Sequence, residues 1–430
     1  MRATLPNDAN APARVDPADR AAPRATDPNR RPISEDIRLE AKNVFKVFAQ
    51  DPRPALAMLK NGRRKDEIYN ETGAVVGVDD ASFAVRTGEI FVIMGLSGSG
   101  KSTLVRLLNR LIEPSAGQVL LGGQDLVRMS RKELIDVRRR EMSMVFQSFA
   151  LLPHLSALDN AAFGLTLSGS PLRKRREAAR AALAKVGLEQ YAERHPHEMS
   201  GGMQQRVGLA RALAKNPSIM FMDEAFSALD PLIRTEMQDE LIRLQKEQQR
   251  TIIFISHDLD EAMRIGDRIA IMEGGRIVQV GTPYDILLNP YDDYVASFFK
   301  NVDLAKVLRA CDVVRAEGLP IASAENTDSP VVLLRQLDVA ASNVLYVVDA
   351  EGRYRGTLGR EAVSEAVRLN RQNLNDLAGL DVSPIAGHSR LSDIMRDVAR
   401  APCPVPIVDQ SGGFLGALSR SQLLNVLHKD

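Results

Sequence analysis

Residues 90–103 read IFVIMGLSGSGKST and give the first indication of the fold. Its first five residues are apolar on both faces of an extended segment, which is typical of a buried parallel strand that helices cover. The glycines that follow let the backbone curve tightly, so that consecutive N–H groups and the start of the next helix face anionic oxygens. The stretch therefore predicts a phosphate-binding loop, whose residues are Gly95, Ser97, Gly98, Ser99, Gly100, Lys101, Ser102 and Thr103.

The residues after the glycines supply a charge and a metal ligand. Lys101 is predicted to place a point charge on the outer phosphates, and the Ser102 hydroxyl is predicted to bind Mg²⁺. Apolar residues then recur at helical spacing from Leu104 to Ile112, as one face of an amphipathic helix. A glycine-rich turn with a chance lysine would not need a buried strand before it and a helix after it. We therefore interpret the stretch as a nucleotide site.

Two further buried strands end in polar residues. Residues 219–224 read IMFMDE, which places Asp223 and Glu224 at the end of one strand. Asp223 can hold Mg²⁺ through its water shell, and Glu224 can orient or deprotonate an attacking water. Residues 252–255 read IIFI and are followed by His257, either a structural histidine or a contact to the γ-phosphate. Such strands alternate with amphipathic helices, which is typical of a doubly wound α/β core.

The composition is that of a globular protein with more than one domain. The length of 430 residues favours two or three domains, and the net charge of +1 argues against nucleic acid as a partner. The two cysteines are far apart, as expected for free thiols in a reducing compartment. No stretch approaches the ~18 apolar residues of a membrane span, so we expect a cytosolic protein that reaches a membrane through partners. Residues 1–32 contain almost no large apolar side chains, which predicts a disordered tail.

A repeat marks the last part of the chain. VVDAEG at 347–352 and IVDQSG at 407–412 match each other sixty positions apart. Self-similarity of this kind predicts two tandem copies of a strand-turn-strand-helix unit. We place the copies at residues 311–370 and 371–430.

Residues 199–206 read MSGGMQQR, which is similar to the signature motif of one ATPase family. Together with the two nucleotide motifs, this motif makes residues 33–300 resemble the ATPase subunits of ABC transporters. The resemblance implies a P-loop NTPase of ABC type, with a RecA-like parallel-sheet core and a helical subdomain at about 150–215. It also assigns Gln147 to sensing Mg²⁺ and the permease, and it assigns His257 to a switch.

The same resemblance implies a head-to-tail homodimer that closes around two ATP molecules. Ser200, Gly201 and Gly202 of one copy would contact the γ-phosphate bound by the other copy. Asp230 would lie in the loop that couples the two sites. The implied ligands of Mg²⁺ are Ser102, Gln147 and, through water, Asp223.

Three positions depart from the family pattern or fit it in more than one way. Met203 stands where glutamine is common and Ala225 where proline is common, but neither change removes a group that touches phosphate. Phe48 aligns with the aromatic residue that stacks on adenine in the family, and packing in the core explains it equally well. A polar insertion at 49–75 separates Phe48 from the phosphate loop.

The insertion, the run at 222–234 and the C-terminal repeats together resemble the ATPase subunits of glycine betaine/proline-type importers. This narrower resemblance implies a peripheral homodimer at the cytoplasmic face of the cell membrane. There it would bind two integral membrane permease subunits that work with a periplasmic or extracellular solute-binding protein. Quaternary ammonium groups bind aromatic cages, but the chain has no Trp and only 5% aromatic residues, so solute selectivity is expected in the partners. Residues 149–163 are either a groove for a permease helix or ordinary packing of the helical subdomain.

The tandem copies resemble a pair of CBS domains, which often bind adenine nucleotides through a Ser or Thr and an Asp three residues later. Those places hold Gly359 and Ala362 in the first copy and Ser419 and Gln422 in the second, so the aspartate is missing twice. Simple AMP binding is therefore doubtful. A cyclic dinucleotide at the dimer cleft, a response to ionic strength and a dimerisation module without ligand all stay open.

Two other functions fit parts of the sequence. One is the ATPase of an ABC importer for another small solute such as an amino acid, and the repeats and the insertion argue against it. The other is a soluble ABC ATPase that acts on ribosomes or DNA. Such proteins usually carry two cassettes or a long coiled-coil insertion, and the near-neutral charge also counts against nucleic acid.

Overall fold

In the computed structural model, most of the chain forms two compact units. The first unit contains residues 34–257 and 266–282, and the second contains 258–265 and the residues from 283 onward. The tail predicted to be disordered, 1–32, lies outside the described residues. The described residues are 34–227, 229–300, 303–314, 316, 318–324, 329–369 and 379–427.

The larger sheet of the first unit confirms the predicted buried strands. Its order is β10-β9-β3-β8-β7-β6, and its pairs are parallel except that of β9 and β10. Every residue of β3, β7 and β8 is buried, as expected for strands covered on both faces. The strands are β3 Ile90–Met94, β6 Met142–Val145, β7 Ile219–Asp223, β8 Thr251–Ser256, β9 Arg268–Glu273 and β10 Arg276–Gly281.

A second, antiparallel sheet in this unit has the order β2-β1-β4-β5. Helix α3 (Lys101–Leu108) packs Leu104, Leu107 and Leu108 in one buried cluster with strands of both sheets. The phosphate loop before α3 is therefore anchored by core packing. The strands of this sheet are β1 Ile37–Phe48, β2 Val75–Arg86, β4 Ala116–Leu121 and β5 Gln124–Asp125.

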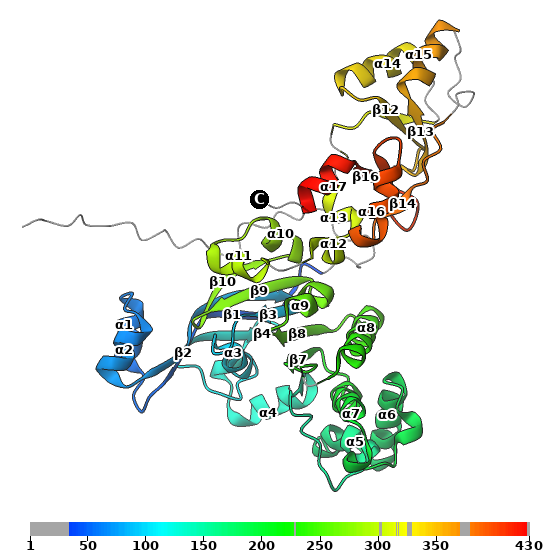
Figure 1. Ribbon diagram of the computed structural model, residues 1–430. Coiled ribbons are helices and arrows are strands. Elements are labelled where there is room, and N and C mark those ends of the chain that lie inside the picture. Colours follow the sequence, from blue (N-terminus) through cyan, green and yellow to red (C-terminus); the bar gives the residue numbers. More distant parts are fainter. Residues whose placement is uncertain are drawn as a thin grey trace, which may run out of the picture. The chain divides into compact units, whose positions relative to one another are not determined.

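Helices α5, α6 and α7 pack against one another within the 150–215 stretch, and Figure 1 shows them as one group. Ser156, Ser200 and Asp230 cap α5, α7 and α8, since each side chain accepts a hydrogen bond from a backbone N–H of the first turn. The caps fix where these helices begin. The helices are α4 Arg131–Arg140, α5 Ala157–Leu167, α6 Leu172–Lys185, α7 Gly201–Ala214 and α8 Pro231–Gln248.

The insertion folds into two helices, α1 (Arg53–Lys60) and α2 (Lys65–Thr72). Its composition is polar, as the sequence shows, but Leu59 and Ile68 are buried in a cluster with Phe45 of β1. A few apolar residues on one face are enough to fix short helices against a sheet, even when the remaining positions are charged. The insertion is therefore a packed part of the first unit.

The second unit begins with α9 (Leu259–Ile265), which starts two residues after His257. Met263 of α9 packs against a buried cluster that includes Leu287 and Leu308. The expected end of the ATPase domain near 300 differs from the division at 282, because α10 contributes Leu287 to this cluster. The helices between α9 and the repeats are α10 Pro283–Leu288, α11 Asp293–Phe298, α12 Leu304–Val307 and α13 Ala310–Val313.

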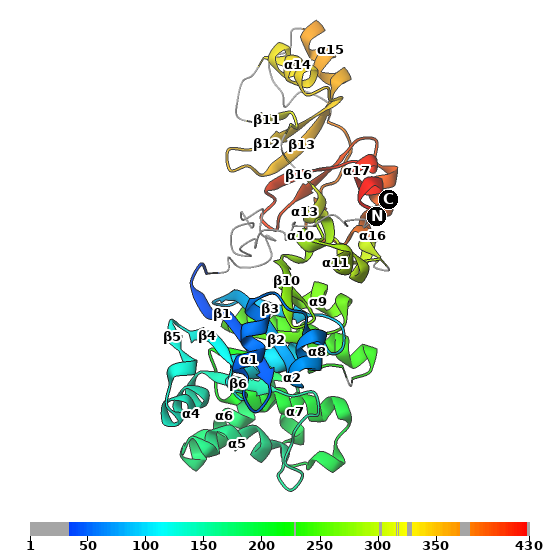
Figure 2. The ribbon, with the colours of Figure 1, turned by 90° about the vertical axis from the view of Figure 1, so that its left-hand side faces the viewer.

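The two repeats have the same strand arrangement. Their sheets have the orders β11-β12-β13 and β14-β15-β16, and in each sheet the first pair is parallel and the second antiparallel. Figure 2 shows α14 and α15 together beside the first sheet. The first repeat contains β11 Ile321–Ser323, α14 Pro330–Val339, β12 Val344–Val348, β13 Tyr354–Gly359 and α15 Arg360–Arg368. The second contains β14 Ile385–Ala386, α16 Leu391–Arg400, β15 Val405–Val408, β16 Phe414–Leu418 and α17 Arg420–Leu427.

The segment at the expected start of the first repeat packs against the second repeat. We place the first copy at 311–370, but the Ala310 N–H donates to the Ser389 carbonyl oxygen at 2.9 Å. Val313 lies in the same buried cluster as Leu391 of α16. Helix α13 therefore belongs to the core of the second copy, because its apolar side chains are buried there.

The packing of the insertion can be tested by stability measurements. Ile68 is fully buried, with 0% exposure, and Ile68→Ala is expected to lower the free energy of unfolding by about 2–5 kcal/mol. Urea denaturation of the full chain measures this difference. Tyr69→Ala is the matched control, because Tyr69 is 57% exposed, and it should change stability by less than about 0.5 kcal/mol. Equal effects of the two substitutions would contradict the packing.

Candidate active site

The phosphate loop has the backbone that its glycines predict. Gly98 and Gly100 have left-handed φ angles of +80° and +100°. A methyl group built on Gly100 would collide with the Gly77 carbonyl oxygen, so only glycine fits there. Ser99 Oγ is buried and has no hydrogen-bond partner among the described residues. A closely wrapped loop with a free buried hydroxyl fits an anionic ligand.

Lys101 lies across this loop. Its Nζ donates hydrogen bonds to the carbonyl oxygens of Gly95 at 2.8 Å and Leu96 at 2.9 Å. Burial lowers the pKa of Lys101, and the nearby carboxylates of Glu224 and Asp223 act in the opposite direction. The loop thus holds a partly dehydrated cation, which phosphate oxygens can stabilise by charge-assisted hydrogen bonds.

The structure brings Ser102 and Asp223 together. Ser102 Oγ donates to Asp223 Oδ1 at 2.9 Å, and Arg106 Nη2 lies 3.9 Å from Asp223 Oδ2. Burial raises the pKa of Asp223, although the hydrogen bond from Ser102 and the charge of Arg106 lower it. Hydroxyl and carboxylate oxygens are ligands that Mg²⁺ accepts, so this pair fits the metal.

Three of the predicted catalytic residues meet at one carboxylate. Gln147 Nε2 donates to Glu224 Oε2 at 3.2 Å, and His257 Nδ1 lies 3.4 Å from the same oxygen. Glu224 has a left-handed φ of +46°, a conformation that non-glycine residues keep only where surrounding contacts hold it. Glu224 is therefore a strained residue at the centre of a polar group, an arrangement able to orient water.

Ser227 belongs to this group and was not predicted. Its Oγ accepts a hydrogen bond from Gln147 Nε2 at 3.3 Å and donates to the Glu224 carbonyl oxygen at 2.9 Å. Ser227 lies in the run at 222–234, three residues before Asp230. A hydroxyl three residues after a catalytic carboxylate, at a helix-like spacing, is the signal that could have indicated it.

Phe48 lies beside the phosphate loop and is not a core residue, since it is 43% exposed. A methyl group built on Gly77 would lie 2.8 Å from Phe48 Cε2 and 3.3 Å from Thr103 Cγ2, so the ring is near the first turn of α3. Lys46 Nζ lies 5.1 Å from the centre of the Phe48 ring. Of the two interpretations of Phe48, the exposed ring favours a binding surface over core packing.

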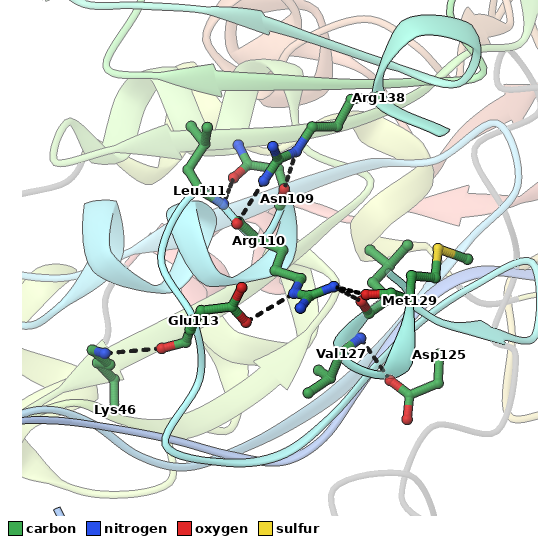
Figure 3. Close-up of polar contacts among 10 residues, drawn as sticks. Lys46, Asn109, Arg110, Leu111, Glu113, Asp125, Val127, Met129 and Arg138 are labelled. Atoms are coloured by element: carbon green, nitrogen blue, oxygen red, sulfur yellow. Dashed lines mark hydrogen bonds and ion pairs between the residues drawn. The ribbon is translucent and has the colours of Figure 1, made fainter. Parts of the chain in front are cut away.

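The loop after α3 is held by side chains from several elements, which Figure 3 shows. Lys46 Nζ donates to the Glu113 carbonyl oxygen at 2.9 Å. Arg138 of α4 donates to the carbonyl oxygens of Asn109 and Arg110, at 3.1 Å and 2.6 Å. Arg110 in turn ties the loop to the carbonyl oxygens of Leu126 and Met129 (Figure 3). The far end of the phosphate-binding helix is thereby fixed.

The residues of the signature motif are placed at the start of α7. Ser200 Oγ accepts a hydrogen bond from the Met203 N–H at 3.3 Å, and Asp230 Oδ1 accepts one from the Ile233 N–H at 3.0 Å. A methyl group built on Gly202 would lie 2.9 Å from Ile233 Cγ2, so Gly202 permits close packing of α7 against α8. These hydrogen bonds stay within their own helices, and none of them reaches Lys101.

Gly359 of the first repeat and Ser419 of the second stand where CBS domains often bind a nucleotide, and both contact other residues of the repeats. A methyl group built on Gly359 would lie 3.6 Å from Leu380 Cδ1, and the Leu380 N–H donates to the Thr357 carbonyl oxygen at 2.8 Å. In the second repeat, Ser419 Oγ accepts a hydrogen bond from the Gln422 N–H at 3.1 Å and donates to its side-chain oxygen at 2.8 Å. Gly359 offers no side-chain donor, and the Ser419 hydroxyl is hydrogen-bonded within its own repeat.

Within the described part of the chain, every helix is too short or too polar to cross a bilayer.

Comparison with known proteins identifies the family. The family model described as ABC transporter matches residues 78–227. The ATP-binding protein ProV of the glycine betaine/proline betaine transport system of Escherichia coli (strain K12) is 51% identical over 396 residues, which cover 92% of this chain and 98% of that protein. The chain belongs to the ATP-binding subunits of ABC transporters.

Other similarities agree with this family. The glycine betaine transport ATP-binding protein OpuAA of Bacillus subtilis (strain 168) is 45% identical, covering 91% of this chain and 92% of that protein. The solved structure of cbiO1 from Clostridium perfringens, part of the ABC transporter complex cbiONQ, has a TM-score of 0.51 and 25% identity, covering 60% of this chain and 93% of that chain. The predicted ABC-type fold is confirmed. As an ABC ATP-binding subunit, the chain binds ATP with Mg²⁺ and hydrolyses ATP.

The buried charge of Asp223 leads to a prediction about pH. Because its folded-state pKa is raised, the carboxylate lowers stability as the pH rises through that pKa. Asp223→Asn should therefore raise the melting temperature of the nucleotide-free protein at pH 7, and the gain should shrink near the unfolded value of about 3.9. The same variant should weaken binding of ATP in the presence of Mg²⁺.

Thermal unfolding across pH and an ATP titration measure these two effects. Glu361→Gln is the control, because it neutralises an exposed carboxylate. If Asp223→Asn destabilised the nucleotide-free protein at pH 7, burial would not be the dominant influence on this carboxylate.

Proposed function

We propose that the chain is the ATPase subunit of an importer for glycine betaine/proline-type compatible solutes. The observation that carries the proposal is the 51% identity to the E. coli protein across 92% of the chain, which includes the insertion and both repeats. A shared nucleotide site alone would support only the wider ABC family. Similarity in the parts outside that site favours the same class of transporter.

The site geometry supports distinct roles for the residues of one copy. Lys101 and the loop N–H groups would bind the phosphates, while Ser102, Gln147 and, through water, Asp223 would hold Mg²⁺. Bound Mg²⁺ would neutralise charge on the phosphates. Glu224 would orient the attacking water and accept its proton, with Gln147 and His257 beside its carboxylate and Ser227 bonded to its backbone carbonyl oxygen.

A second copy would complete each site. The start of α7 is formed by Ser200, Gly201 and Gly202, and its backbone N–H groups can face an anion. Within one chain, the hydrogen bond of Ser200 stays in its own helix and does not reach Lys101. In a head-to-tail homodimer they would bind the γ-phosphate held by the partner, and Asp230 would lie between the two sites. Phe48, exposed beside Thr103, would stack on adenine.

Glu224→Gln tests the dimer. Without the carboxylate, hydrolysis should fall by about 10²–10⁴-fold, and ATP should remain bound between two copies. Light scattering of this variant should give twice the monomer mass with Mg²⁺ and ATP and the monomer mass with ADP, which lacks the γ-phosphate. A variant that binds ATP yet stays monomeric would contradict the shared site.

The transport partners follow from the same proposal. A peripheral dimer at the cytoplasmic face would bind two membrane permease subunits, with an external solute-binding protein supplying the solute. Residues 149–154 follow Gln147, and Pro153 and His154 are exposed there, which suits a docking place for a permease helix. The repeats would regulate transport, through ionic strength or a cyclic dinucleotide, since neither copy carries the aspartate that simple AMP binding would use.

Reconstitution tests the function directly. The full chain is assembled with its permease and binding protein in proteoliposomes, and ATP-driven uptake of labelled glycine betaine is measured at several salt concentrations. We expect uptake that needs ATP, is absent with Glu224→Gln and rises with salt. Uptake of labelled amino acids without uptake of glycine betaine would support the other importer class instead.

A further inference from the structure

The segment that follows Gln147 packs along one face of α7. Gly201, Gly208 and Arg211 recur at spacings of seven and three residues, which places them along the same side of the helix. A methyl group built on Gly201 would lie 3.8 Å from Phe149 Cζ, and one built on Gly208 would lie 3.6 Å from the Phe149 carbonyl oxygen. Phe149 therefore lies along α7, with its ring beside the signature motif.

Arg211 fixes the backbone of this segment. Its Nη1 donates to the Ala150 carbonyl oxygen at 2.6 Å, and its Nη2 donates to the Phe149 carbonyl oxygen at 3.1 Å. Burial lowers the pKa of Arg211, but a guanidinium stays charged at neutral pH. In the part of the chain that the structure describes, Arg211 forms no ion pair, so the two carbonyl groups are what stabilise its charge.

The residues held by Arg211 have an unfavourable backbone. Phe149 and Ala150 have left-handed φ angles of +53° and +47°, and neither is glycine. The Ala150 N–H also donates to the Ser148 carbonyl oxygen, which closes a three-residue turn. Such a turn persists only where other contacts hold it. The two hydrogen bonds from Arg211 to the Phe149 and Ala150 carbonyl oxygens are suited to hold this turn.

The downstream end of the segment is fixed by Asn160 of α5, which is fully buried. Its Oδ1 accepts from the Leu152 N–H at 2.8 Å, and its Nδ2 donates to the carbonyl oxygens of Leu152 and Leu155, both at 3.0 Å. The exposed residues Pro153 and His154 lie between these contacts. Residues 149–155 thus form a short strap. Arg211 of α7 holds its first end and Asn160 of α5 holds its second end, while its middle is exposed.

We propose that Arg211 couples the permease-facing segment 149–154 to the signature end of α7. A force applied by a permease helix to this segment reaches Arg211 through the two carbonyl groups, and it reaches Gly201 through the Phe149 ring. Since α7 is a continuous helix, Ser200 at its N-terminus moves with them. The inference rests on the proposed function, which places the permease at this segment. Arg211 is a positioning residue, because it acts through the backbone of 149–150.

Arg211→Met and Arg211→Lys test the coupling in the reconstituted complex. Met cannot donate, and Lys offers a single point charge in place of a fork that reaches two carbonyl groups. We expect the ATP affinity of the full chain to stay within about twofold of the wild-type value. Solute uptake per ATP hydrolysed should fall by about tenfold with Met and by less with Lys, which is within the range of known coupling effects. Hydrogen exchange of residues 146–156 in the full chain should become faster in both variants.

Arg250→Lys is the matched control. Arg250 is also buried and donates to Asn216 Oδ1 at 2.6 Å, away from the strap, so uptake per ATP and exchange of 146–156 should not change. Faster exchange with unchanged uptake per ATP in the Arg211 variants would show a merely structural contact and overturn the inference. Unchanged exchange would also overturn it, and this result can be obtained even if the wild-type complex transports no glycine betaine and the proposed function fails. If Arg211→Met does not fold, Arg211→Lys decides the outcome.

Discussion

The nucleotide site depends on two opposite charges that the fold keeps partly out of water. Lys101 opens the helix that follows β3, and Asp223 ends β7, so the positions of both are set by core strands. Burial disfavours the charged form of each group, lowering the pKa of Lys101 and raising that of Asp223. A nucleotide polyphosphate with its metal ion supplies the missing counter-charges on both sides. Keeping both charges partly dehydrated costs stability in the nucleotide-free protein, and binding of a nucleotide would recover that cost.

The order of the strands explains why Gln147, Glu224 and His257 meet. β6, β7 and β8 are neighbours in one parallel sheet, and Gln147, Glu224 and His257 each follow the carboxyl end of one of them. Carboxyl ends of parallel strands lie at one edge, which is where α/β proteins place their ligands. Residues far apart in the chain therefore converge on a single carboxylate without a specialised loop.

The same reasoning shows what the sequence could and could not predict. Residues 90–94 and 219–222 are apolar throughout. The polar residues that follow them are expected at the carboxyl edge of the sheet, so the fold and the position of the glycine-rich loop were predictable. The packing of Ile68 and the location of α13 were not, because short amphipathic stretches fit several apolar surfaces equally well. Arg211 was missed for another reason: it donates hydrogen bonds to two backbone carbonyl groups, and such bonds leave no residue pattern to read. Ser227 could have been indicated only by its spacing of three residues from Glu224.

The unit boundary beside His257 has a practical consequence for dissecting the protein. Helix α9 starts two residues after this histidine, yet its Met263 is packed in the cluster formed by α10, α12 and the second repeat. Trimming the chain from its C-terminus would strip away the apolar surroundings of an internal helix and leave its buried side uncovered. The ATPase half prepared by such a cut would carry an uncovered helix two residues after His257, so its activity would not measure that of the half in the intact chain.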